Sequence, residues 1–244
     1  MTMRVIELID AAGITAFSTL RDTGCPESPY AGFNTCDYTG DDAEHVAGCR
    51  EELACKLGID LTAIYFPRQT HSANVAVIDG SDVDLEGVDA LVTALPGVAL
   101  AIHTADCVPV VLADPVAGVI AAVHSGWRGT VGKIAEEALG AMTRLGAEPA
   151  RIVAAMGPCI CADCFEVGDE VAQKFEEKGC VIRSYTRPHV DLPEAVALGL
   201  AAAGVSRSNI SMPPACSRCN HGEYFSARRL GINSGRTLTV IMRR

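Results

Sequence analysis

The 244-residue sequence has few aromatic residues, few basic residues and no long apolar run. Its 20 lysines and arginines are outnumbered by 30 aspartates and glutamates, which gives a formal net charge of −10. This acidic balance argues against a nucleic-acid-binding protein, whose binding surface is basic. No stretch of about 18 residues is free of charges and helix breakers, so we expect no membrane span and no membrane partner.

The amino terminus also lacks the features of an exported protein. Residues Met1 to Glu7 contain no long apolar segment, so we expect no secretory signal and a cytoplasmic location. Cysteine, in contrast, is abundant, with 11 in the chain. In a reducing compartment these residues are thiols, which pack as small apolar side chains, bind metals or react.

Length and composition suit one large domain spanning residues 1–244, since 49% of the residues are hydrophobic. Apolar runs predict strands at Ile14–Thr19, Val75–Ile78, Ala90–Thr93, Val98–His103, Val108–Ala113, Val119–His124, Ile152–Met156 and Leu238–Met242. Apolar spacings of three and four predict helices at Asp42–Leu57, Val131–Leu145, Asp169–Lys178 and Pro193–Ala203. Since no helix is predicted between residues 75 and 124, some neighbouring strands pair antiparallel. We expect the α/β class, with a mixed sheet and helices packed outside it.

Three polar residues stand at the edges of these apolar runs. His71 follows the segment Tyr65–Thr70, Cys107 separates two predicted strands, and His124 ends a third strand before a small-residue loop. Such positions let a rigid scaffold present a side chain beside a cleft.

Two imidazoles and one thiolate form a ligand set that suits Zn²⁺. Three protein ligands leave a fourth position open, which is typical of a catalytic site. Spacing along the chain does not bring the three residues together, however, and each is equally compatible with an ordinary place in the core. A Cys-His pair can also act without a metal, as a thiolate nucleophile with a general base.

Several segments together resemble the YfiH family, which is also called the laccase-domain or DUF152 family. The similarity covers nearly the whole chain in order. The matching segments are Gln69-Thr70-His71, Asp89–Thr93, Thr104–Val110, His124–Thr130, Gly157-Pro158, Phe165–Gly168, Tyr224–Arg229 and Ser234–Arg236.

This resemblance implies a single-domain α/β sandwich of mixed sheets between helices. It implies a zinc site made by His71, Cys107 and His124, and an activity on purine nucleosides with phosphate as second substrate. Phosphorolysis of adenosine, inosine, guanosine and methylthioadenosine and deamination of adenosine are the implied reactions. Some members of the family are instead linked to the editing of peptidoglycan precursors, which would suit a Cys-His hydrolase or amidase.

The family also carries an older label of polyphenol oxidase. Multicopper oxidases bind four copper ions through many histidines, usually in His-X-His pairs. This sequence has six histidines and no such pair, so we disfavour copper as the cofactor, although a Cys-His site could take it up adventitiously.

Phosphorolysis requires groups that bind phosphate, which guanidinium groups do well. The candidates are Arg128 beside His124, Arg68 beside the Gln-Thr-His segment, and Arg229 with its neighbours Arg228 and Arg236 in the basic carboxyl-terminal stretch. Asn34 lies in a segment that resembles an asparagine-containing loop of the family and is a candidate to hydrogen-bond substrate, or else a turn or cap residue.

Deamination requires a proton carrier. The familiar zinc deaminases use the glutamate of a His-X-Glu motif, which this sequence lacks at His71 and His124. Asp106, next to Cys107, is the alternative, either as the proton carrier or as the carboxylate that orients an imidazole.

Five further cysteines form two short groups. Cys159, Cys161 and Cys164 lie close together, and Cys216 with Cys219 makes a Cys-X-X-Cys pair. Their spacing permits a four-thiolate structural zinc site, and it equally fits reduced or redox-sensitive thiols.

Overall fold

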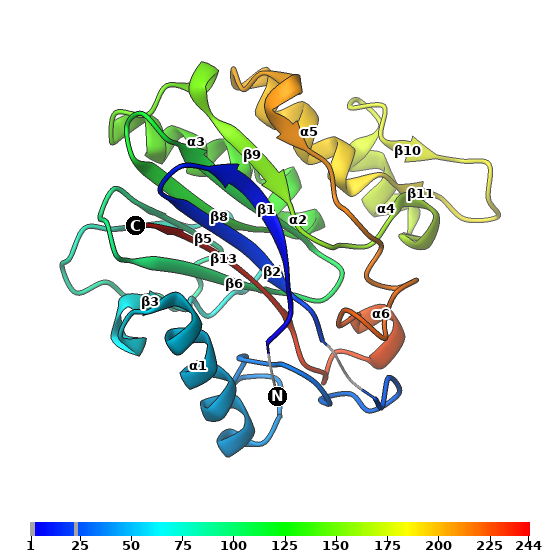
Figure 1. Ribbon diagram of the computed structural model, residues 1–244. Coiled ribbons are helices and arrows are strands. Elements are labelled where there is room, and N and C mark those ends of the chain that lie inside the picture. The colour runs from blue at the N-terminus through cyan, green and yellow to red at the C-terminus, as the bar shows by residue number, and fades with distance from the viewer. Residues whose placement is uncertain (1–2, 22–23) are drawn as a thin grey trace.

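Two mixed β-sheets lie face to face at the centre of the molecule (Figure 1). The structure is a computed structural model that describes residues 3–21 and 24–244. The five-stranded sheet has the order β1-β2-β13-β6-β3, and the six-stranded sheet has the order β12-β9-β7-β8-β5-β4. A separate hairpin pairs β10 with β11.

The chain alternates unevenly between strands and helices. The strands are β1 (Val5–Ala11), β2 (Ile14–Thr19), β3 (Ile64–Tyr65), β4 (Val75–Ile78), β5 (Ala90–Thr93), β6 (Ala99–Thr104), β7 (Val108–Asp114), β8 (Val119–Ser125), β9 (Val153–Met156), β10 (Val181–Ile182), β11 (His189–Val190), β12 (Ile210–Ser211) and β13 (Thr237–Arg243). The α-helices are α1 (Ala43–Leu57), α2 (Trp127–Val131), α3 (Ile134–Arg144), α4 (Asp169–Ala172), α5 (Leu192–Ala202) and α6 (Ala227–Leu230). Short 3₁₀ turns are η1 (Leu61–Ala63), η2 (Pro149–Arg151), η3 (Ala162–Cys164), η4 (Gln173–Phe175) and η5 (Arg207–Asn209).

The central strands are apolar throughout because both of their faces are buried. In β8, Ile120 and Ala122 belong to the cluster between the two sheets, whereas Val119, Ala121 and Val123 belong to the cluster under the helices. Successive side chains of a strand point to opposite faces, so an alternating pattern would leave one face polar. The continuous apolar runs of β6, β7 and β8 therefore place these strands in the middle of a layered molecule.

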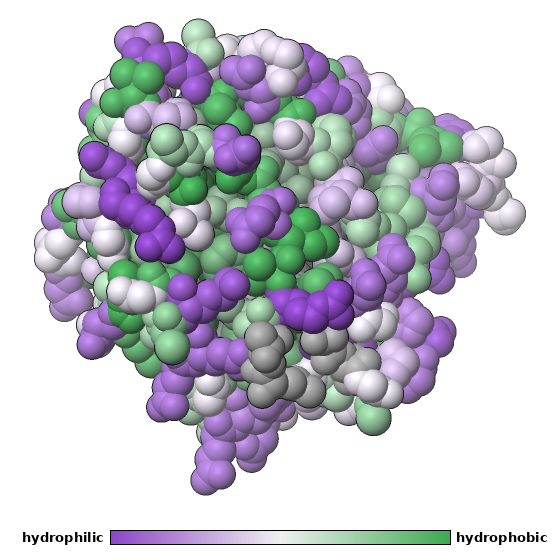
Figure 2. All heavy atoms as spheres, in the orientation of Figure 1, coloured by the Kyte–Doolittle hydropathy of each residue, from purple (hydrophilic) through white to green (hydrophobic). Residues whose placement is uncertain are grey.

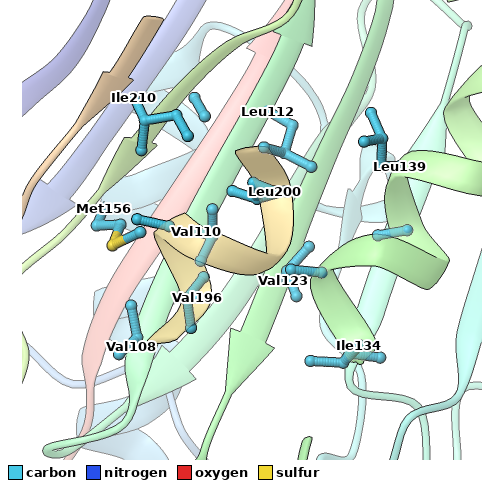
Figure 3. Close-up of a cluster of buried hydrophobic side chains, with 14 of the residues drawn as sticks. Val108, Val110, Leu112, Val123, Ile134, Leu139, Met156, Val196, Leu200 and Ile210 are labelled. Carbon is cyan, nitrogen blue, oxygen red and sulfur yellow. The ribbon is translucent and has the colours of Figure 1, made fainter. Parts of the chain in front are cut away.

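Helices α3 and α5 cover the outer face of the six-stranded sheet. Figure 3 shows Val110, Leu112 and Val123 of the sheet facing side chains of both helices, including Leu139 of α3 and Leu200 of α5. All five of these side chains are buried. Burying a leucine or valine side chain contributes roughly 1.5–3 kcal/mol, so this cluster is a large part of the stability of the fold.

Helix α1 packs on the outer face of the five-stranded sheet. Its amino terminus is capped by Asp42, whose carboxylate accepts hydrogen bonds from the N–H groups of Glu44 and His45. It ends at Gly58, whose φ of 69° is in the left-handed region.

On the face of the molecule shown in Figure 2, hydrophilic side chains predominate around the rim and hydrophobic ones gather toward the middle.

The structure confirms the predicted fold class. Each strand predicted from an apolar run is present within one or two residues of its expected bounds, and residues 75–124 contain no helix. The predicted antiparallel pairing is found between β7 and β8 and between β5 and β8. The result is a sandwich of two mixed sheets flanked by helices.

Two predicted helices differ from those observed. The segment Val131–Leu145 is not one helix, because Lys133 has a φ of 62° and α3 begins only at Ile134. The segment Asp169–Lys178 is helical only to Ala172 and then tightens to the 3₁₀ turn η4, which turns Phe175 into the core.

Strand β1 was not predicted from the sequence. It is an edge strand whose residues are mostly half-exposed and include Glu7 and Asp10, so it lacks the continuous apolar run of the central strands. Within residues 3–21 and 24–244, no helix combines the length and the apolar character that crossing a membrane requires.

Candidate active site

His71, Cys107 and His124 come together at one edge of the six-stranded sheet. His71 lies in the loop between β3 and β4, Cys107 lies between β6 and β7, and His124 is in β8. Their potential ligand atoms are all within 4.8 Å of one another. The two imidazole rings meet at 74°, with centroids 4.8 Å apart. His124 is buried, Cys107 is half-buried and His71 is exposed, so the group opens to solvent on one side.

The backbone around the group is held in unusual conformations. His71 and Asp106 have φ values of 62° and 88°, in the left-handed region that few residues other than glycine adopt. Such conformations persist where surrounding contacts impose them, and they concentrate at functional sites. Here they turn the His71 and Cys107 side chains toward His124.

Asp89, directly before β5, binds the ring of His124 and the backbone at His71. Its carboxylate accepts a hydrogen bond from His124 Nδ1 at 2.7 Å. It also accepts hydrogen bonds from the backbone N–H groups of Thr70, His71 and Ser72, at 3.2, 3.0 and 2.7 Å. The bond to His124 Nδ1 leaves Nε2 as the free ring nitrogen, which is the usual arrangement of a metal-binding histidine and its carboxylate partner.

Asp106 does not orient either imidazole, contrary to one of its two expected roles. Its carboxylate instead accepts hydrogen bonds from Ser217 Oγ and from the backbone N–H of Arg228, both at 2.7 Å. The carboxylate that orients His124 belongs to Asp89, directly before β5, and the pairing of Ala90 with Val123 brings it there. The sequence alone does not show this strand pairing.

Electrostatics favour an ionised pair at the centre of the site. Burial raises the pKa of the Cys107 thiol, but the charge of His124 and hydrogen bonds from both histidines outweigh it and lower the pKa to about 6. Burial lowers the pKa of His124, but Cys107 and Asp89 outweigh it and raise the pKa to about 9. Without a metal ion, the pair is therefore a thiolate and an imidazolium at neutral pH.

The donor set and the space around it fit a zinc ion. Two imidazoles and one thiolate are ligands that Zn²⁺ accepts, with an open position for a reactant. Gly126 leaves this space clear, because a Cβ atom there would lie 2.9 Å from both Cys107 Sγ and His71 Cδ2. All six histidines lie within the described residues, and of these only His71 and His124 take part in such a group. Two histidines are too few for a four-copper centre.

Two cavities flank the three residues, and both are lined by His71, Cys107 and the small residues Ala105 and Ala227. The first, of about 260 Å³, is also lined by Asp106, Trp127, Arg128, Ile160, Phe165, Leu192 and Arg228. The second, of about 220 Å³, is also lined by Tyr38, Gln69, His103, His124, Ile232 and Arg236. The site therefore has an apolar side with two arginines and a more polar side with one arginine.

The four residues expected to bind substrate or phosphate lie in different places. Arg128 lines the larger cavity, with its guanidinium 4.3 Å from the centroid of the Trp127 ring. Arg68 lines a neighbouring cavity with Tyr38 and forms an ion pair with Glu86 at 3.3 Å.

Asn34 and Arg229 do not line either of the two cavities that flank the site. Asn34 is fully buried, where its side chain donates to Asp41 and accepts from the backbone N–H of Arg236, at 2.7 and 3.0 Å. Arg229 is exposed and pairs with Glu27. The Asn34 side chain thus joins Asp41 to the backbone of Arg236. Arg228 and Arg236, the other two arginines of the basic stretch, line the cavities.

His103 is a residue of the site that sequence reasoning did not select. It is buried, stacks on Phe66, and its Nε2 lies 2.8 Å from Thr35 Oγ1. Burial and the nearby charges of Arg50 and Arg236 lower its pKa to about 3, so it is a neutral ring in the wall of the smaller cavity. Its position at the end of the apolar run of β6 was the available signal.

Fold and site together define an α/β sandwich with a His-Cys-His group at the sheet edge. The chain belongs to the family described as multi-copper polyphenol oxidoreductase laccase, whose model matches residues 15–244. This finding confirms the resemblance to the YfiH family.

Curated relatives match over most of their length. Adenosine deaminase RL5 from an unknown prokaryotic organism is 51% identical over 248 residues, covering 95% of each chain. A purine nucleoside phosphorylase of Bacteroides thetaiotaomicron is 39% identical, covering 95% of this chain and 92% of that protein. Relatives of this chain are thus named as enzymes that act on purine nucleosides.

Solved structures show the same fold. YlmD from Geobacillus stearothermophilus superposes with a TM-score of 0.88 at 34% identity, covering 96% of this chain and 93% of that one. A hypothetical protein YfiH from Bacillus licheniformis superposes with a TM-score of 0.88 at 31% identity, covering 95% and 93%.

Proposed function

We propose that this chain is a zinc-dependent purine nucleoside phosphorylase that also deaminates adenosine. The observation that carries this proposal is the convergence of His71, Cys107 and His124 within 4.8 Å, beside two cavities lined by arginines. The names of the relatives support the substrate class. All 11 cysteines are free thiols in the structure, which suits a reducing compartment such as the cytoplasm.

His71, Cys107 and His124 would hold the zinc ion, with Asp89 keeping both imidazoles in position. When bound, Zn²⁺ supplies a Lewis acid that stabilises negative charge as it develops on a reacting group. Among the described residues, Asp106 of the larger cavity is the one carboxylate that lines either cavity, and it is our candidate for the group that moves a proton.

In phosphorolysis, a phosphate oxygen forms a bond to the ribose C1′, the bond from C1′ to N9 breaks, and the departing purine takes a proton. Arg128 and Arg228 of the larger cavity supply positive charge for the phosphate. Ile160, Phe165 and Leu192 supply an apolar wall against which a purine can pack. In deamination, water adds to C6 of adenine and ammonia leaves, and the same cavity would hold the base.

The test is turnover of inosine and adenosine with and without phosphate, with bases and nucleosides separated by chromatography. We expect the zinc-loaded protein to release free purine only with phosphate, and to convert adenosine to inosine without it. The Cys107→Ala variant and chelator-treated wild type should each lose both reactions. Added zinc should restore both reactions to the chelator-treated protein and neither to Cys107→Ala. Cys55→Ala, an exposed cysteine of α1, is the matched control and should keep both.

A second candidate is a metal-free Cys-His hydrolase that cleaves an amide of a peptidoglycan precursor. The lowered pKa of Cys107 and the chain from Cys107 through His124 to Asp89 favour it. This enzyme would work fully in a chelator and fail in Cys107→Ala. If the wild type is inactive on every nucleoside but cleaves such an amide in chelator, the zinc phosphorylase proposal is wrong.

A further inference from the structure

Four cysteines away from this site form a second group of potential metal ligands. Cys161 and Cys164 follow β9, and Cys216 and Cys219 precede α6. Although the two pairs are far apart in the sequence, all four sulfur atoms lie within 4.8 Å of one another. Figure 1 shows the yellow-green segment after β9 and the orange segment before α6 meeting beside the helices at the right of the view.

Backbone hydrogen bonds fix the two segments against each other. The N–H of Ser217 donates to the carbonyl of Cys159 at 2.9 Å, and the N–H of Cys159 donates to the carbonyl of Ala215 at 3.3 Å. The N–H of Cys161 points at Cys216 Sγ, 3.4 Å away. The cysteines are therefore held together by the fold, and N–H groups that point at sulfur stabilise thiolates.

Both pairs have the Cys-X-X-Cys spacing that is common in structural zinc sites. Cys161 and Cys164 are joined by the single 3₁₀ turn η3, which brings their side chains to the same side. Tetrahedral coordination with zinc–sulfur bonds of about 2.3 Å places the sulfur atoms about 3.8 Å apart. The observed separations, 3.4 Å between Cys164 and Cys219 and at most 4.8 Å overall, are close to this value.

The surroundings suit a negatively charged metal–thiolate centre. A zinc ion with four thiolates carries a net charge of −2, and interactions with Cys164 raise the pKa of the neighbouring Arg218 guanidinium, which keeps a positive charge beside the group. Cys161, Cys164 and Cys216 are half-buried and Cys219 is exposed, so an ion can enter. A disulfide explains the group less well, because it would use two of the four sulfurs, and the Cys164–Cys219 separation exceeds a bond of about 2.05 Å.

We propose that Cys161, Cys164, Cys216 and Cys219 bind one structural Zn²⁺ ion that joins the segment after β9 to the segment before α6. Both segments contact Asp106, the residue next to Cys107. The N–H of Ile160 donates to the carbonyl of Asp106 at 2.9 Å, and Ser217 Oγ donates to the Asp106 carboxylate at 2.7 Å. The ion would therefore hold the wall of the larger cavity in place.

Metal content measured by inductively coupled plasma mass spectrometry tests the proposal. We expect two zinc ions per chain in protein prepared with zinc under reducing conditions, and one in a Cys164→Ser/Cys219→Ser variant. Cys107→Ala should also retain one ion, since its loss affects only the His-Cys-His group. Cys55→Ser, on α1, should retain two.

Cobalt replacement provides a second measurement if the double variant fails to fold. Thiolate-to-cobalt charge-transfer absorption grows with the number of sulfur ligands, so Cys107→Ala loaded with Co²⁺ should keep a strong tetrathiolate spectrum. A Cys107→Ala protein that binds neither zinc nor cobalt would overturn the proposal. So would a folded Cys164→Ser/Cys219→Ser variant with unchanged zinc content, or peptide mapping that shows a disulfide within the group in protein prepared under reducing conditions. None of these outcomes bears on nucleoside turnover at the first site.

Discussion

Asp89 organises the His-Cys-His group although it lines neither of the two flanking cavities. Its carboxylate bonds the ring of His124 and the backbone at His71. Burial raises its pKa, but the hydrogen bond and charge of His124 and the hydrogen bonds of Ser72 outweigh burial and lower the pKa to about 2. It is therefore a carboxylate throughout the physiological range and accepts all of these hydrogen bonds.

We expect Asp89→Asn to weaken zinc binding at the His-Cys-His group by about 10- to 100-fold. The amide nitrogen cannot accept the hydrogen bonds that the lost oxygen accepted, so the two imidazoles lose their common anchor. Competition with a chromophoric chelator measures the change, in a Cys164→Ser/Cys219→Ser background if the second group binds metal. Asp82→Asn, on an exposed loop, should leave the affinity unchanged. Equal affinity for Asp89→Asn would show that the carboxylate does not position the ligands.

Cys107 should differ from the other thiols in its reaction with iodoacetamide. Its pKa of about 6 makes it a thiolate at pH 7, whereas burial raises the pKa of Cys49 and Cys36. In metal-depleted protein, we expect alkylation of Cys107 to rise with pH, with a midpoint near 6, and then to level off. Peptide mass spectrometry measures the rate at each cysteine.

His124→Ala is the variant that tests the cause of this reactivity. Without His124, its charge and its hydrogen bond to Cys107 are lost, and only His71 still opposes the effect of burial, so the midpoint should move well above 6. A Cys107 midpoint that stays near 6 in this variant would show that the charge of His124 does not lower the pKa.

The sequence was sufficient to select His71, Cys107 and His124 as candidates, because each interrupts or ends an apolar run. It was not sufficient to select Asp89 or Arg236. Asp89 reaches His124 only through the register of β5 on β8, and Arg236 reaches the cavity from the other end of the chain. Both relations depend on strand pairing, which local patterns do not encode.

At the scale of elements, burial on both faces decided which strands could be predicted. Strands β6, β7 and β8 have long apolar runs since each contributes to two clusters. The exposed edge strand β1 has no such run, and the two-residue strands β3 and β12 are too short to show a pattern. The break at Lys133 also escaped prediction, because the apolar spacing continues through it while the backbone does not.

Asp114, at the end of β7, links the turn before β8 to the 3₁₀ turn η2 through hydrogen bonds. Its carboxylate accepts hydrogen bonds from the Arg151 side chain and from the backbone N–H groups of Val116, Ala117 and Glu148. Burial raises its pKa, but these hydrogen bonds outweigh burial and lower the pKa to about 2. Asp114 thus favours the folded state at any pH where it is ionised in the unfolded chain.

We expect Asp114→Asn to lower the free energy of unfolding at pH 7 by about 2 kcal/mol. The unfolded pKa of aspartate is about 3.9, so the stabilisation by Asp114 is complete above this value and is lost as the pH falls through about 2. The difference between wild type and variant should therefore shrink between pH 4 and pH 2. Urea denaturation across this range measures it, with Asp82→Asn as the control. A difference that stays constant down to pH 2 would contradict the assignment.

At the scale of the whole molecule, three apolar clusters alternate with the two sheets and their covering helices. The middle cluster draws Leu100, Ile102 and Ile241 from the five-stranded sheet and Val111 and Ile120 from the six-stranded sheet. Neither sheet can lose this contact without exposing the inner face of the other. The clusters therefore couple the two sheets energetically, and we propose that the chain forms one domain, as its length and composition predict.

A single domain of this kind should unfold in one transition. With zinc in excess, far-ultraviolet circular dichroism, which follows all helices and strands, should give the same urea midpoint as the fluorescence of Trp127, the one tryptophan in the chain. Ile120→Ala removes a fully buried side chain between the sheets and should lower the free energy of unfolding by about 2–5 kcal/mol in both signals. Val116→Ala, at a position that is 76% exposed, should change it by less than about 0.5 kcal/mol. If the circular dichroism and fluorescence midpoints of the wild type differ, the two sheets unfold separately and the chain is not one cooperative unit.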